Sequence, residues 1–130
     1  MQATTRILMV TAFLLTAASA PGGQTAATAR VMREKLVHTQ NMLRALMVSD
    51  HQLLEKESGA LMRLTKEDGW QVLTSPEYLR QSSAFVQTLD DLVDAAKRND
   101  LDGAAVAYAA MTMRCYQCHR YLKAVRRADR

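Results

Sequence analysis

The chain has 130 residues, of which 48% are hydrophobic and 23% are charged, and its formal net charge is +4 at pH 7. This balance excludes an intrinsically disordered chain, and the apolar runs are too short for a multi-pass membrane protein. Five glycines and two prolines are too few for the turns of an all-β fold, and 5% aromatic residues are too few for a stacking platform that binds single-stranded nucleic acid.

Residues 1–20 have the pattern of a secretory signal peptide. Arg6 supplies the positive start, residues 7–15 are almost continuously apolar, and Ala18-Ser19-Ala20 has small residues where a signal peptidase reads the chain. We expect cleavage after Ala20 and export of residues 21–130 as one domain, to the periplasm in a bacterium. An uncleaved membrane anchor is the alternative. Because the apolar stretch is short for a membrane span, we favour cleavage and expect no membrane span in the exported chain.

Two amphipathic helices are predicted in the first half of the exported chain. The second begins at Ser49, with Gln52 three residues later in a capping-box pattern, and ends at 68–69. Its apolar set is Leu53, Leu54, Leu61, Met62 and Leu64. The first covers residues 25–48, and its apolar stripe is Met32, Leu36, Thr39, Leu43 and Leu46.

Two further helices complete the chain. The third starts with Ser75 as N-cap and Pro76 at the first helical position, and it closes at 97–99. The fourth starts at Asp100 and keeps its apolar period almost to the C-terminus. Four amphipathic helices with short connections predict an all-α fold, an antiparallel four-helix bundle. The stripe of the third helix is Tyr78, Leu79, Phe85, Leu89, Leu92 and Val93.

The residues that carry chemistry lie in the last predicted helix. The two cysteines of the chain and one histidine form Cys115-Tyr116-Gln117-Cys118-His119, the signature for attachment of c-type haem. Residues three apart share one helix face, so both thiols can bond to one porphyrin edge while His119 reaches the iron as proximal ligand. We therefore expect one covalent haem c as the cofactor.

Two other uses of the cysteines are less favoured. A thioredoxin-type disulfide pair follows a strand, and no strand is predicted before Cys115. A zinc site needs about four ligands, and outside the motif His38 and His51 are the remaining donors without a second cysteine pair.

An exported four-helix chain with this motif on its last helix resembles the class II c-type cytochromes, which are cytochrome c′ and its low-spin, Met-ligated relatives. The resemblance covers residues 28–127 and is specific at the motif. It implies a haem enclosed by the bundle, with the first helix crossing its distal face. It also implies an aromatic residue between the second and third helices. Trp70 matches that place, as a haem contact or as a core plug.

The sixth iron ligand is expected from the first helix. The sequence Met32-Arg33-Glu34-Lys35-Leu36 resembles the first-helix pattern of the low-spin branch, which implies Met32 as distal ligand and a raised reduction potential. Other assignments stay open: Leu36 could cover an empty distal site, and His38, Lys35 or Met42 could ligate the iron instead.

Basic residues are expected near the edge of the haem. Arg33 and Lys35 are candidates to pair with the haem propionates, with an ordinary solvated helix face as the other interpretation. Lys123, Arg126 and Arg127 would surround an exposed haem edge and dock it transiently on acidic redox partners.

The favoured function is therefore that of a one-electron carrier without enzymatic activity, since no acid–base or nucleophile constellation is found. A haem with an empty sixth position would instead bind NO or CO. A third possibility, a helical interaction module without haem, would require that the two cysteines have no chemical role. No Lys/Arg block favours nucleic acid as a partner. Bundles of this family often pair, which leaves a homodimer open.

Overall fold

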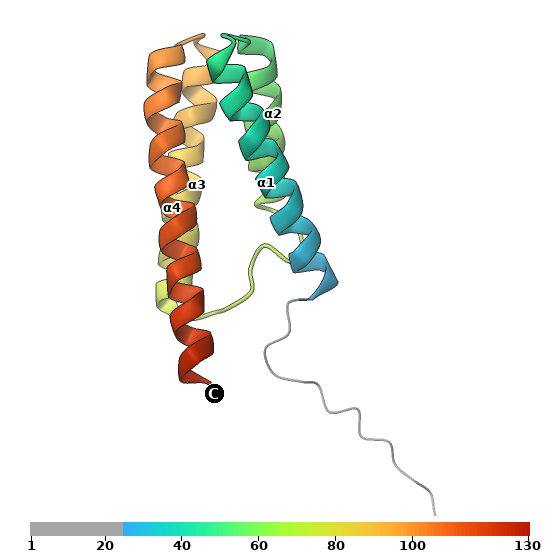
Figure 1. Cartoon of the computed structure of the whole chain (residues 1–130), viewed down its shortest axis with the longest axis vertical. Helices are drawn as coiled ribbons and strands as arrows, with labels where there is room; N and C mark the ends of the chain where they lie inside the picture. The colour runs from blue at the N-terminus through green and yellow to red at the C-terminus, as the bar shows by residue number, and fades with distance from the viewer. Residues whose placement is uncertain (1–24) are drawn as a thin grey trace, which may run out of the picture.

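The computed structural model describes residues 25–130, which form four α-helices and no strand. α1 spans Ala26–Met47, α2 His51–Leu64, α3 Pro76–Lys97 and α4 Leu101–Ala128. α1 packs mainly on α2, α3 packs mainly on α4, and the two hairpins meet chiefly through α2 and α3 (Figure 1). This confirms an all-helical fold with four helices. The predicted signal peptide lies outside the described residues.

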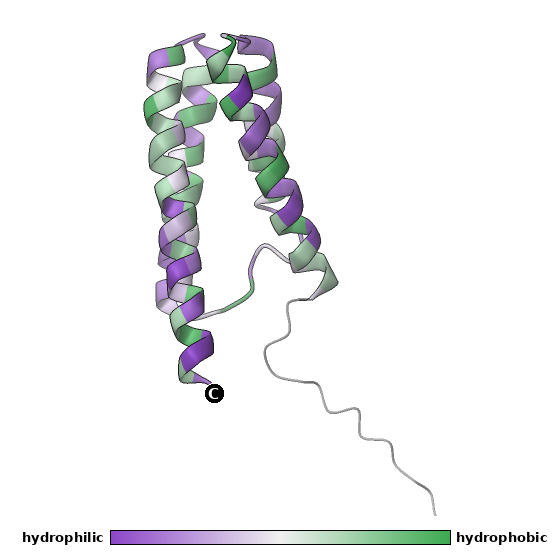
Figure 2. Cartoon of the chain, viewed as in Figure 1, coloured by the Kyte–Doolittle hydropathy of each residue, from purple (hydrophilic) through white to green (hydrophobic). Residues whose placement is uncertain are grey.

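The two hairpins meet closely at one end and diverge toward the other (Figure 1). The close end holds the short connectors 48–50 and 98–100, and the long connector 65–75 crosses between the hairpins in the diverging half. Hydrophobic residues are frequent in the upper part of α4, whereas hydrophilic residues dominate its lower part (Figure 2). Within residues 25–130, no helix combines the length and the apolar character that a membrane span requires.

The helix starts follow from side chains that accept hydrogen bonds from free backbone amides. The predicted caps Ser75 and Asp100 each accept from the backbone N–H three residues later. The prediction of Ser49 as the cap of α2 is wrong. Asp50 accepts from the backbone N–H of Leu53, while Ser49 takes a left-handed φ of 56° to close the turn. α2 also ends earlier than predicted, at Leu64, because short turns occupy the residues that follow.

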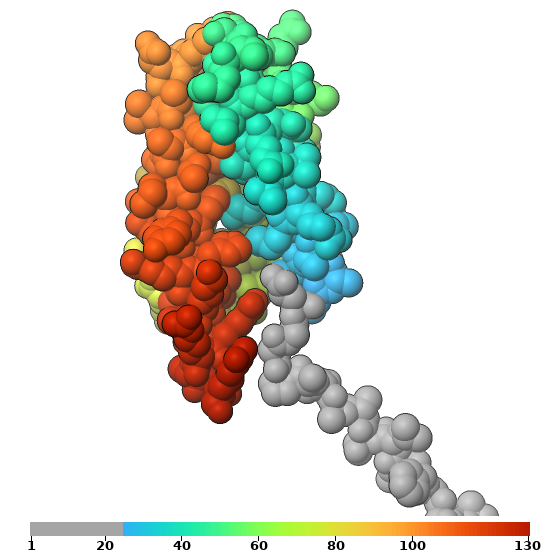
Figure 3. Space-filling model, in the orientation of Figure 1, coloured from blue at the N-terminus to red at the C-terminus, as the bar shows by residue number. Residues whose placement is uncertain are grey.

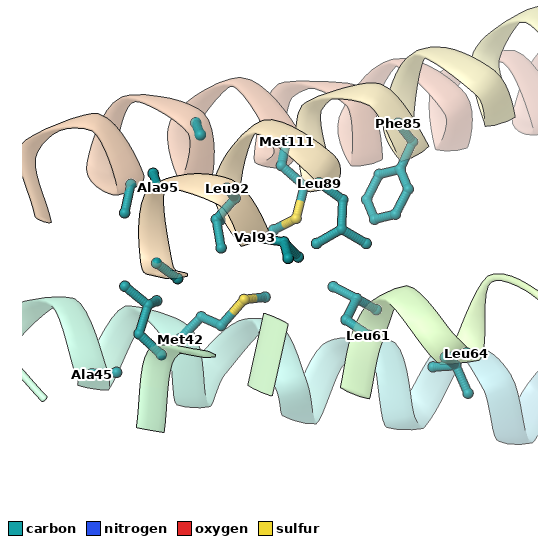
Figure 4. Packing of buried hydrophobic residues seen from close by; sticks show 14 of the residues in the cluster. Met42, Ala45, Leu61, Leu64, Phe85, Leu89, Leu92, Val93, Ala95 and Met111 are labelled. Carbon is teal, nitrogen blue, oxygen red and sulfur yellow. The ribbon is translucent and has the colours of Figure 1, made fainter. Parts of the chain in front are cut away.

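The hydrophobic core lies between the hairpins toward their close end. Side chains of α1 and α2 face those of α3 and α4 across it (Figure 4). The largest fully buried hydrophobic side chains are Val31, Met42, Leu54, Leu61, Phe85, Leu89, Leu92 and Met111. Leu79, which was expected in the stripe of α3, is exposed instead.

The buried face of α1 differs from the predicted stripe. Leu36 and Leu43 are 57% and 45% exposed. The buried residues are Thr28, Val31, Met42 and Ala45, and this inward line continues at helical spacing through positions 35 and 38. The polar residues Lys35 and His38 therefore occupy inward positions.

One of these inward polar residues is partnered by α2. His38 Nδ1 lies 2.6 Å from Glu57 Oε2, and Asn41 Nδ2 donates to the same oxygen at 3.3 Å. Burial of Glu57 alone would raise the pKa of its carboxyl. The hydrogen bonds from His38 and Asn41 outweigh that effect, so the pKa of Glu57 is lowered. A carboxylate with a lowered pKa stabilises the fold above its unfolded pKa, and this contribution is lost as the pH falls through the folded pKa.

We expect Glu57→Gln to lower the free energy of unfolding by about 1–3 kcal/mol at pH 7, because a buried, charge-assisted hydrogen-bond set is lost. The difference from the wild type should shrink below about pH 4, where the wild-type carboxyl also becomes protonated. Urea titrations at pH 7 and pH 3 measure both effects. Glu55→Gln, at an exposed carboxylate of the same helix, is the matched control. An equal loss at both pH values would contradict the role of the charge.

Candidate functional site

A cavity of about 640 Å³ lies between the diverging halves of the hairpins. The first turns of α1, the connector after α2, the first half of α3 and the last half of α4 line it. The space-filling view shows the surface hollowed between the lower parts of α1 and α4 (Figure 3). Its volume lies in the range typical of cofactor sites. Five of the predicted site residues line this one cavity: Met32, Lys35, Trp70, Cys118 and His119.

The two cysteines lie on α4, one turn apart, and both are free thiols. Cys118 lines the cavity, and Cys115 packs against the hydrophobic core next to it. Burial raises the pKa of both thiols, and the positive charge of Lys35 acts against that rise. Both thiols are therefore partly buried, on the side of α4 that faces the core and the cavity.

His119 lines the cavity and is also exposed to solvent. Partial burial lowers the pKa of its imidazole, and the positive charges of Lys35, Lys123 and Arg126 lower it further. A lowered pKa favours the neutral ring at pH 7, and a neutral ring has a free lone pair for a metal ion.

Lys35 extends its amine into the cavity. Its Nζ lies 3.8 Å from the ring centroid of Phe85 and 4.6 Å from that of Trp70. Burial lowers the pKa of Lys35, and the two cysteines partly counter that effect. In the part of the chain that the structure describes, Lys35 forms no ion pair with a carboxylate. The aromatic rings are its main stabilising contacts.

Trp70 is both a core residue and a wall of the cavity. Its side chain is 8% exposed, and its ring packs 5.3 Å from that of Phe85 at 46°. The indole Nε1 donates to Ser82 Oγ at 2.8 Å. Tyr78 Oη donates to the Trp70 carbonyl at 2.5 Å and accepts from the backbone N–H of Val72 at 3.2 Å. These bonds fix the connector over the cavity.

Three of the residues weighed in the sequence do not face the cavity. Arg33 is exposed and does not line it, so it is not brought together with the motif. Leu36 points to solvent, because it lies off the inward line of α1, and it does not line the cavity. His38 is bonded to Glu57 of α2 and also lies outside the cavity.

Within residues 25–130, no group of three or more His, Cys, Asp or Glu side chains is arranged to hold a metal ion.

The α3 wall of the cavity contains residues that the sequence pattern did not indicate as a site: Tyr78 and Phe85 were predicted only as part of the apolar stripe, and Gln81 and Ser82 had no predicted role. Tyr78, Gln81, Ser82 and Phe85 line the cavity from one face of α3. Gln81 and Ser82 are polar residues between two aromatic positions of a buried stripe. Such polar interruptions of an apolar stripe are the signal that could have indicated a site.

Comparison of the chain with protein-family models, curated proteins and solved structures found no match. The chemistry of the donors must therefore decide which group suits the cavity. Two half-buried thiols one turn apart, a neighbouring imidazole and aromatic walls fit a flat, apolar macrocycle with a metal at its centre.

Proposed function

We propose that this chain is an exported c-type cytochrome that carries single electrons, with one haem c bound through Cys115 and Cys118 and ligated by His119. The resemblance to the class II cytochromes is part of this proposal. The observation that carries it is that Cys118 and His119, with Cys115 beside them, lie against a cavity of about 640 Å³. A haem attachment motif without such a cavity would leave the porphyrin in water.

When bound, haem c supplies an iron that alternates between Fe(III) and Fe(II). The chain's own residues would hold and shield it. Cys115 and Cys118 would anchor one edge, and His119 would hold the proximal side. Trp70 and Phe85 would exclude water from the inner part of the cavity, and this burial tunes the reduction potential.

Basic residues at the end of α4 support docking on acidic redox partners. Lys123 and Arg126 line the cavity, and Arg127 follows them on the same exposed end of the helix. Positive charge beside the cofactor steers an acidic partner to the site of electron exchange. Lower salt should therefore speed the encounter.

An optical spectrum of the holoprotein tests the proposal. The chain is produced in a host that attaches c-type haem, and ferric and ferrous spectra are recorded with and without CO. A low-spin spectrum in both states, unchanged by CO, is expected of an electron carrier with six ligands. A high-spin spectrum that shifts with CO would favour a gas-binding protein instead. Absence of covalent haem would overturn both functions.

A further inference from the structure

We propose that the amine of Lys35, rather than the thioether of Met32, is the sixth ligand of the haem iron. This inference rests on the proposed haem site and names the residue that completes it. On ligation the ammonium would release its proton to solvent, and the nitrogen lone pair would form the bond to iron. The chain would then supply a histidine and a lysine to the iron, instead of a histidine and a methionine.

The first support is the position of Lys35 on α1. The buried residues Thr28, Val31, Met42 and Ala45 define the inward line of this helix, and position 35 falls on it. Met32 lies next to that line, and the side chains of both Met32 and Lys35 are partly buried. An inward lysine without an acidic partner among the described residues is energetically unfavourable, because burying an unpaired charge costs free energy. A role as a ligand would account for its position.

The second support is where the amine lies. Long side chains on a helix lean toward the helix N-terminus, which for α1 is the diverging end of the bundle. The Nζ atom consequently lies over the rings of Phe85 and Trp70 inside the cavity. Lys35, Cys118 and His119 line the same cavity, so the amine and two side chains of the motif face one space.

The third support is that nothing else among the described residues holds the amine. Neither a carboxylate nor a hydrogen-bond acceptor contacts Lys35 Nζ there, and its recorded contacts are the faces of the Phe85 and Trp70 rings. Once its proton has passed to solvent, an amine without a competing partner can donate its lone pair to iron. The other role considered for Lys35, pairing with a haem propionate, suits a cation at a solvent-facing edge. The ammonium lies instead among aromatic rings on the inner side of the cavity.

The test compares three variants of the holoprotein: Lys35→Arg, Met32→Leu and, as a control, Lys66→Arg at an exposed connector position. Arginine keeps the positive charge but does not ligate iron. Absorption and near-infrared magnetic circular dichroism spectra distinguish nitrogen from sulfur as the sixth ligand. We expect the wild type to be low-spin without the far-red ferric band of a sulfur–iron bond. Lys35→Arg should become high-spin and bind CO in the ferrous state, whereas Met32→Leu and Lys66→Arg should keep the wild-type spectrum.

Failure of this inference differs from failure of the proposed function. Covalent haem with a far-red sulfur–iron band in the wild type, lost in Met32→Leu, would assign the ligand to Met32 and overturn the role of Lys35. A high-spin wild type would also overturn it. If Lys35→Arg yields no holoprotein, the spectra of Lys35→Gln and of the wild type decide whether Lys35 is the sixth ligand. A wild type without covalent haem would overturn the cytochrome assignment itself.

Discussion

Replacing Cys115 and Cys118 together by alanine is expected to reduce covalently bound haem from one per chain to none. The thiols are the two cysteines of the whole chain; Cys118 lines the cavity, and Cys115, one turn earlier, packs against the core. Without them, no other side chain can form the thioether bonds that define c-type haem. The measurement is the intact mass of the purified protein, together with its absorbance after denaturation, which removes any haem that is not covalently bound.

Tyr116→Phe is the matched control for the cysteine variant. Tyr116 lies inside the motif, but its side chain is 60% exposed and does not line the cavity. This variant should carry the same haem content as the wild type. Covalent haem in the double alanine variant, or equal loss of haem in the control, would refute the attachment site.

Gly69→Ala is expected to lower the free energy of unfolding by about 2–4 kcal/mol, because it combines backbone strain with a steric clash. Gly69 has a φ of +93°, a region that residues with a Cβ atom rarely adopt. A Cβ atom there would lie 2.6 Å from the carbonyl carbon of Ala27 and 2.7 Å from the backbone nitrogen of Thr28. Backbone atoms at the start of α1 cannot yield as a flexible side chain would, so the connector or the helix must shift.

The position of Gly69 ties this clash to the cavity. Gly69, Ala27 and Thr28 all line it, and Trp70 follows directly. Urea unfolding followed by circular dichroism measures the loss of stability, and tryptophan fluorescence reports whether Trp70 becomes more exposed. Gly59→Ala is the control, because its nearest contact is the side chain of Arg63 at 3.7 Å. Within α2 this substitution should stabilise the helix by up to about 1 kcal/mol. Equal stability of Gly69→Ala and Gly59→Ala would contradict the prediction, because it would show that the connector accommodates the added Cβ atom.

Local signals in the sequence were sufficient for the four helices and for the starts of α3 and α4. Ser75 with Pro76, and Asp100, begin α3 and α4 as predicted, because capping depends on residues within one turn. The start of α2 was misplaced by one residue, since Ser49 and Asp50 are both good caps. The left-handed turn at Ser49 decides between them.

The inward face of α1 could not be predicted from its own residues. Leu36 and Leu43 made an apolar stripe that satisfies helical spacing, yet both are exposed, and Lys35 and His38 face inward. A helix with apolar residues on more than one side has more than one acceptable orientation. The contacts of α1 with other elements determine which orientation it adopts. Glu57 pairs with His38, and the amine of Lys35 lies over the rings of Trp70 and Phe85.

By itself, the sequence determined the helical class and the Cys-x-x-Cys-His spacing of Cys115, Cys118 and His119, because periodicity, caps and residue spacing are local properties of the chain. Only the tertiary structure decided which side chains from other parts of the chain lie beside this motif. Divergence of the two hairpins leaves a cavity in which Lys35 from α1 and Trp70 from the connector come together with Cys118 and His119 from α4. Residues more than 80 positions apart become neighbours only through the packing of whole helices, which depends on the burial of all four at once.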